Sequence, residues 1–135
     1  MELCQQSLRA VDAALAAPGG LARRLAGALD AKIGHFQRLL AGSPHAPELL
    51  DGSATIAAEP LAKLDRAFRD ALERAIKEGG LGLDSRRRAE LLELILAAGY
   101  GTARQGELGG RLASPGLRAK LERHVEILLA GAVSR

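Results

Sequence analysis

The chain has 135 residues, of which 47% are hydrophobic, 26% are charged and only 2% are aromatic, and its formal net charge is +3. This length and balance fit one globular domain that can bury a core, and no run of about eighteen apolar residues exists to span a membrane. Because basic and acidic residues are interspersed, an ordinary mixed-charge surface is favoured over a dedicated nucleic-acid interface, and the scarcity of aromatic residues makes a base-stacking platform unexpected.

Alanine and leucine dominate the apolar residues, and both are strong helix formers, so we expect an all-α fold. Phe36, Phe68 and Tyr100 are the only aromatic residues, and the core must therefore be aliphatic. Cys4 is the only cysteine, which rules out an intrachain disulfide and a cysteine-based metal site. The first residues lack the features of a signal peptide, and together these points predict a cytoplasmic protein.

Two helices are expected first. Residues 2–17 repeat apolar side chains at helical spacing and end at a Pro-Gly-Gly sequence at 18–20. Residues 21–41 form the next helix, which ends at Gly-Ser-Pro at 42–44. Its apolar face carries Leu21, Leu25, Leu29, Ile33, Phe36 and Leu40, with His35 beside it.

A short helix within residues 43–53 and a long one within 54–78 follow. The long helix starts either at Pro60 or near Ser53, in which case the proline kinks its first turns. Its outer face carries acid-first pairs four residues apart, which stabilise a helix by roughly 0.2–0.5 kcal/mol each. These pairs are Asp65 with Arg69, Asp70 with Arg74, and Glu73 with Lys77.

The helix expected over residues 84–104, capped by Asp84 or Ser85, has two apolar stripes. A helix with two apolar stripes is expected to pack against other helices on both sides. In so short a chain, we expect the second of these packing surfaces to belong to another subunit. A glycine-rich loop is expected over 101–110. The first stripe comprises Leu91, Leu94, Ile95 and Ala98, and the second comprises Leu92, Leu96, Gly99 and Ala103.

Three arginines, Arg86, Arg87 and Arg88, occupy the first turn of that helix, where the helix dipole disfavours cations. They are either solvated charges balanced by Glu90 and Glu93, or part of an ion pair between subunits, or an anion site.

The last helix is expected over residues 114–130, with Ser114 as its cap and Pro115 in its first turn. It stops near Gly131. It also has more apolar surface than one core face needs, since Ile127 and Leu129 widen a stripe made by Leu117, Leu121, Val125 and Leu128.

No catalytic constellation or local metal-ligand spacing is present, and His35, His45 and His124 form no paired motif. We expect no enzyme activity, cofactor or metal. Two alternatives stay open: a small helical enzyme or metal-binding protein that uses His35, His45 and the acidic residues near them, and a basic nucleic-acid binder. The binder would use Arg23 and Arg24 together with residues 86–88.

The order of elements carries a resemblance to a known family. The sequences are AAPGG at 16–20, DAKIGHFQRLLAGSPHAPELLD at 30–51, FRDALERAIKEGGL at 68–81 and LDSRRRAELLELILAAGYG at 83–101. The chain as a whole resembles the C-terminal ligand-binding and dimerisation domain of TetR-family transcriptional regulators. It has no helix-turn-helix pattern, so either a longer protein is truncated at Met1 or the chain is a stand-alone effector domain.

The resemblance implies one domain over residues 1–135, a bundle of five to six helices that forms a homodimer through 86–104 and 114–130. It implies a small apolar effector, and DNA binding only through a separate N-terminal domain. The implied dimer interface contains Leu92, Leu96, Gly99, Leu121, Val125 and Leu128. The implied ligand-binding residues are His35, Phe36, Leu40, Phe68, Leu72 and Tyr100.

Overall fold

The computed structural model describes residues 2–34, 58–108 and 116–133, and every regular element in these ranges is a helix. The all-α helical bundle predicted from composition is confirmed. The elements, in chain order, are α1 (Glu2–Ala16), α2 (Leu21–Leu29), the π-helix η1 (Asp30–Gly34), α5 (Ala58–Glu78), α6 (Ser85–Leu108) and α7 (Leu117–Val133).

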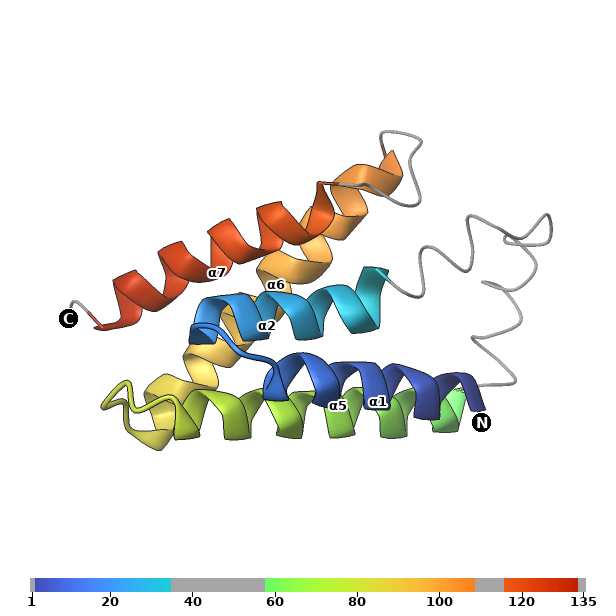
Figure 1. Cartoon of the computed structure of the whole chain (residues 1–135), viewed down its shortest axis with the longest axis horizontal. Helices are drawn as coiled ribbons and strands as arrows, with labels where there is room; N and C mark the ends of the chain where they lie inside the picture. The colour runs from blue at the N-terminus through green and yellow to red at the C-terminus, as the bar shows by residue number, and fades with distance from the viewer. Residues whose placement is uncertain (1, 35–57, 109–115, 134–135) are drawn as a thin grey trace.

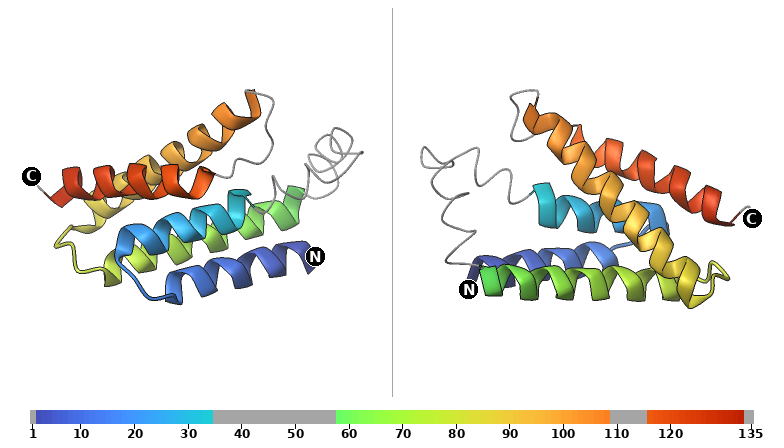
Figure 2. Two further views of the ribbon diagram at one scale, coloured as in Figure 1. Left: turned by 45° about the horizontal axis from the view of Figure 1, so that its top comes forward. Right: turned by 180° about the vertical axis from the view of Figure 1, so that it is seen from behind.

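Helix α2 lies at the centre of the described bundle. α1 and α5 run side by side below it, α7 lies above it, and α6 crosses behind it (Figure 1). α6 packs on α5 on one side and on α7 on the other, as the two further views show (Figure 2). Each helix therefore contributes an apolar face to one common core.

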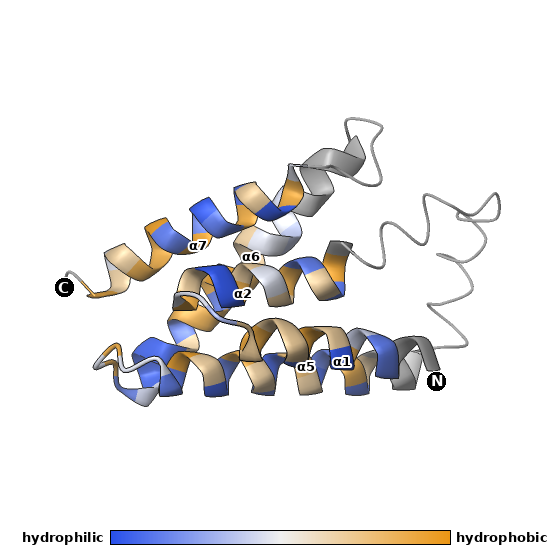
Figure 3. Ribbon diagram, in the orientation of Figure 1, coloured by the Kyte–Doolittle hydropathy of each residue, from blue (hydrophilic) through white to orange (hydrophobic). Residues whose placement is uncertain are grey.

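The core is built from aliphatic side chains around a single phenylalanine. Hydrophilic residues recur along the outer edge of α5, while its apolar residues face the bundle (Figure 3). Burying these side chains is the main favourable contribution to folding. The largest fully buried side chains are Phe68, Leu25, Leu29, Leu72, Ile76, Ile95, Leu121, Val11 and Val125.

Local chemistry sets where α5 ends and α6 begins. Gly80 and Gly82 have φ values of +67° and +73°, which glycine adopts without steric strain, and they turn the chain after α5. Asp84 then caps α6, since its carboxylate accepts a hydrogen bond of 2.8 Å from the backbone N–H of Arg87. The prediction of Asp84 as one of two possible caps is confirmed.

Three boundaries differ from expectation. The second helix changes at Asp30 into the π-helix η1, which periodicity alone did not indicate. α6 continues to Leu108 through most of the expected loop, and α7 continues past Gly131 to Val133. Glycine costs a helix only about 1 kcal/mol per residue, and tertiary packing offsets that cost. In α6, Thr102 also bonds back to the carbonyl of Ala98 at 2.7 Å.

Some expectations fall on residues 35–57 and 109–115, which lie outside the described ranges. They include the end of the second helix, the short helix within 43–53, the first turns before Ala58 and the capping role of Ser114. In the described part of the chain, no helix is both long enough and apolar enough to cross a membrane.

Gly99 allows a close approach between α6 and the end of α2. A Cβ at this position would lie 3.0 Å from a methyl carbon of Leu29 and 3.5 Å from one of Ile33. We therefore expect Gly99→Val to lower the free energy of unfolding by about 1–3 kcal/mol, because the added methyl groups overpack the core. Urea denaturation followed by circular dichroism measures this change.

Gly101 provides the matched control, because it lies in the same helix and a Cβ there would meet nothing within 4 Å. Gly101→Ala is expected to stabilise the protein by roughly 0.5–1 kcal/mol through helix propensity alone. Equal effects of the two substitutions would contradict a tight contact at Gly99.

Candidate functional site

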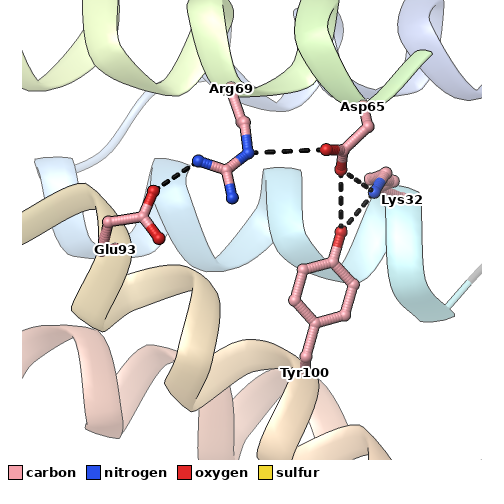
Figure 4. A network of polar contacts seen from close by, with 5 residues as sticks. All are labelled: Lys32, Asp65, Arg69, Glu93 and Tyr100. Carbon is pink, nitrogen blue, oxygen red and sulfur yellow. Dashed lines mark hydrogen bonds and ion pairs between the residues drawn. The ribbon is translucent and has the colours of Figure 1, made fainter. Parts of the chain in front are cut away.

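A chain of polar contacts joins η1, α5 and α6 on one side of the bundle (Figure 4). The ammonium of Lys32 donates a hydrogen bond to the carboxylate of Asp65 at 3.1 Å and another to the hydroxyl of Tyr100. The Tyr100 hydroxyl lies 3.5 Å from the same carboxylate oxygen. The guanidinium of Arg69 bridges the other oxygen of Asp65, at 3.4 Å, to Glu93 of α6.

Two aromatic rings complete the surroundings of Lys32. Its Nζ lies 4.9 Å from the centre of the Phe68 ring and 5.0 Å from that of the Tyr100 ring. The Phe68 distance fits cation–π attraction, whereas Nζ approaches Tyr100 at the edge of its ring, where it bonds the hydroxyl. The Lys32 side chain is only 14% exposed, whereas Asp65 is 45% exposed. An ammonium ion is thus held by one ring face, a tyrosine hydroxyl and a carboxylate, with one side of the cluster open to solvent.

The charges of this cluster perturb its ionisable groups. Partial burial alone raises the pKa of Asp65, but the hydrogen bond and charge of Lys32, together with Arg69, outweigh burial and hold that pKa below its ordinary value. The hydrogen bond to Glu93 raises the pKa of Arg69. Lys32, Asp65, Arg69 and Glu93 carry formal charges that cancel, so the cluster is neutral at pH 7.

The lowered pKa of Asp65 predicts a pH-dependent contribution to stability. A carboxylate with a depressed folded-state pKa stabilises the fold above its unfolded pKa of about 4 and loses this effect as pH falls through the folded value. The parent chain should therefore exceed Asp65→Asn in free energy of unfolding at pH 7, by less than about 1 kcal/mol because the group is half exposed. Urea titrations between about pH 7 and pH 3 should show the difference shrinking on acidification. A difference that is constant over this range would contradict the assignment.

A second feature is a groove of about 540 Å³ between the beginning of α6 and the end of α7. This volume lies within the range of small-molecule or side-chain docking sites. Leu94 and Ile127 line it and are 55% and 59% exposed, so that they present apolar surface side by side in one groove. The remaining lining residues are Leu83, Arg87, Glu90, Leu91, Leu128, Gly131 and Ala132.

The three arginines of the first turn of α6 have different surroundings. Arg86 pairs with Glu90 at 3.5 Å, and Arg88 donates a hydrogen bond of 2.9 Å to the carbonyl of Leu83. Arg87 lines the groove, and its guanidinium has no ion-pair partner within the described part of the chain. The first of the three interpretations, solvated and balanced charges, fits Arg86, whereas Arg87 lies beside an apolar surface.

The predicted ligand-binding residues fall into three groups. Phe68 and Leu72 of α5 are fully buried members of the core. Tyr100 is 40% exposed, and the ammonium of Lys32 contacts both its hydroxyl and the ring of Phe68. The other three, namely His35, Phe36 and Leu40, lie outside the described residues. Their ligand-binding role stays a prediction.

The residues assigned to the dimer interface do not face outward. Leu92, Leu96, Gly99, Leu121 and Val125 are buried within the single chain. The physical reason is that other helices of the same chain pack on α6: Gly99 of the second stripe lies against Leu29 and Ile33, and Leu91 of the first stripe lines the groove shared with α7. The place of the six residues in a dimer interface stays a prediction, and only Leu128 borders the exposed groove, where it is half-buried.

The alternative of a metal-binding protein is not supported by the described residues. Within ranges 5–33, 62–102 and 116–133, where side chains are described, no three His, Cys, Asp or Glu residues gather closely enough to hold a metal ion. The imidazole Nδ1 of His124 lies 3.0 Å from the hydroxyl of Thr102 and joins α7 to α6. His35 and His45 lie outside these ranges.

Sequence reasoning missed Lys32, Glu93 and the exposed face containing Ile127 as site residues. Lys32 and Tyr100 are 68 positions apart, and no local pattern links them. The Asp65–Arg69 ion pair was predicted from its spacing, and the structure contains it. This pair was the part of the polar cluster that the sequence could indicate. Leu94 had been placed in a stripe, but its exposure depends on how α7 crosses α6.

Comparisons of this chain with protein-family models, with curated proteins and with solved structures found no match.

Proposed function

We propose that this chain is a dimerising, effector-responsive domain of a TetR-like transcriptional regulator. In this proposal, two copies pair through the exposed faces of α6 and α7, and a small molecule bound near η1 alters the position of α1. DNA binding belongs to a separate helix-turn-helix domain joined to α1. The observation that carries the proposal is the apolar groove between α6 and α7, with the exposed side chains of Leu94 and Ile127.

The groove supports a second copy as the occupant because its chemistry is self-complementary. Leu94 and Ile127 expose apolar surface, and contiguous apolar surface of this kind marks interaction sites. Arg87 and Glu90 add both signs of charge to the lining, so that two copies related by a two-fold axis can approach without net repulsion. We therefore place the proposed interface on this face and not on the buried stripes.

The contacts of η1 support a route from a bound effector to α1. η1 packs against α1 as well as α2, α6 and α7. It also carries Lys32, which contacts Tyr100 and Asp65 in the polar cluster. A ligand that changes the position of η1 would therefore act on the contacts of α1, which is the helix next to the proposed DNA-binding domain.

A fusion experiment tests dimerisation and regulation together. The chain is joined through Met1 to a heterologous helix-turn-helix module that binds a palindromic operator only as a dimer. We expect the fusion to repress a reporter gene under that operator, and the fusion carrying Leu94→Glu to lose most of this repression at equal protein level. Absence of repression by the unmodified fusion, when a known dimerisation domain in its place represses, would contradict the proposal.

A further inference from the structure

The surroundings of Lys32 have the composition of a binding site for an organic cation. The face of the Phe68 ring lies 4.9 Å from its Nζ, the carboxylate of Asp65 lies 3.1 Å away, and the hydroxyl of Tyr100 accepts a hydrogen bond from it. A ring face carries negative electrostatic potential, and carboxylate and hydroxyl oxygens accept hydrogen bonds from an ammonium group. Here the ammonium that fills the cage is part of the chain itself.

The backbone that delivers this ammonium is irregular. Lys32 is the middle residue of η1, the five-residue π-helix Asp30–Gly34 that follows α2 directly. π-helical turns are less common than α-helical ones and occur frequently at functional sites. The residue that inserts into the cage thus lies within the irregular turn.

The cage is accessible from one side. Phe68 forms a fully buried wall, but Tyr100 is 40% exposed and the Asp65 side chain is 45% exposed. A ligand can therefore reach the carboxylate and the tyrosine ring from solvent, and only the Lys32 side chain has to leave for its cation to take the same place.

We propose that the cage formed by Phe68, Tyr100 and Asp65 binds a small alkylammonium ion, which displaces the ammonium of Lys32. This inference deepens the proposed function, on which it rests for its regulatory meaning, by naming the chemical class of the effector. Displacement frees Lys32 and with it the π-helical turn, whose contacts extend to α1. The binding step itself does not require a dimer.

The chain contains its own probe for this test. Tyr100 is the only tyrosine and there is no tryptophan, so intrinsic fluorescence reports on the cage alone. The unmodified protein is titrated with butylammonium and, as a neutral control of matched shape, with butanol. We expect a saturable change of Tyr100 fluorescence with butylammonium and none with butanol.

Two variants of similar side-chain size sharpen the result. Lys32→Met removes the ammonium group but keeps most of the length of the side chain, and butylammonium should bind it about tenfold more tightly than the unmodified protein. Asp65→Asn removes the carboxylate charge, and binding should weaken about tenfold. Circular dichroism checks that both variants are folded.

The proposal would be overturned by an equal response to butylammonium and butanol. Binding by Lys32→Met but not by the unmodified protein would overturn it too, since Lys32 would then be a fixed structural group. Neither result bears on the reporter assay of the dimerising fusion, so failure of this inference and failure of the proposed function can be told apart.

Discussion

A chain carrying Leu94→Glu is expected to be a folded monomer under conditions in which the unmodified chain is a dimer. Leu94 is 55% exposed in the single chain, so a carboxylate there remains solvated in the monomer. In the proposed dimer the same carboxylate would be buried against apolar surface, and the dissociation constant should rise about a hundredfold, or roughly 2.7 kcal/mol. Sedimentation equilibrium measures this change.

Two other substitutions separate dimerisation from folding. Ala13→Glu adds the same charge on the exposed surface of α1 and should leave the dissociation constant unchanged. Leu96→Glu places a carboxylate in the core, where Leu96 is only 3% exposed, and should unfold the chain. If Leu94→Glu and Ala13→Glu had the same dissociation constant as the unmodified chain, the α6–α7 face would not be the interface.

Phe68→Ala is expected to lower the free energy of unfolding by about 3–5 kcal/mol. The ring is completely buried, it is the only aromatic side chain among the buried residues that the structure describes, and the ammonium of Lys32 lies over it. Its removal leaves a large cavity in a core of branched aliphatic side chains, which collapse into it only in part. Because small domains are stable by only about 5–15 kcal/mol, the variant should approach unfolding at 37 °C.

Urea denaturation measures the effect of Phe68→Ala, with Phe68→Leu as a control that keeps most of the buried volume. The leucine variant should lose clearly less stability than the alanine variant. A loss below about 1 kcal/mol for alanine would mean that the ring is not in the core, and the cage around Lys32 would then lack its buried wall.

The helical spacing of apolar residues predicted which faces are buried, but not which helices pack against them. Leu25, Leu29 and Ile33 were placed on one face of the second helix, and all three are in the core. The two apolar stripes of α6 were also recognised, although Leu94 of the first stripe is 55% exposed. The sequence could not say that α2, η1 and α7 of the same chain pack on α6, because helical spacing defines an apolar face without identifying what lies against it.

The candidate site depended on contacts that no local pattern contains. The Asp65–Arg69 pair follows from spacing of four residues, but the extension to Lys32 and Tyr100 joins three separate helical elements. The π-helix that places Lys32 was also invisible, since five residues are too few to separate its period from that of an α-helix. Ile127 was seen as surplus apolar surface, and the structure shows that the surplus is exposed beside the groove.

The measurement that tests the proposed dimer most directly is a spin–spin distance between two copies of the chain. Since Cys4 is the only cysteine, Cys4→Ser with Leu94→Cys gives a single labelling site on the groove, and Cys4→Ser with Glu73→Cys gives a control on the exposed surface of α5. The proposed interface predicts strong dipolar coupling between labels at position 94 and weaker coupling, or none, at position 73. Uncoupled labels at position 94 at micromolar concentration would contradict it.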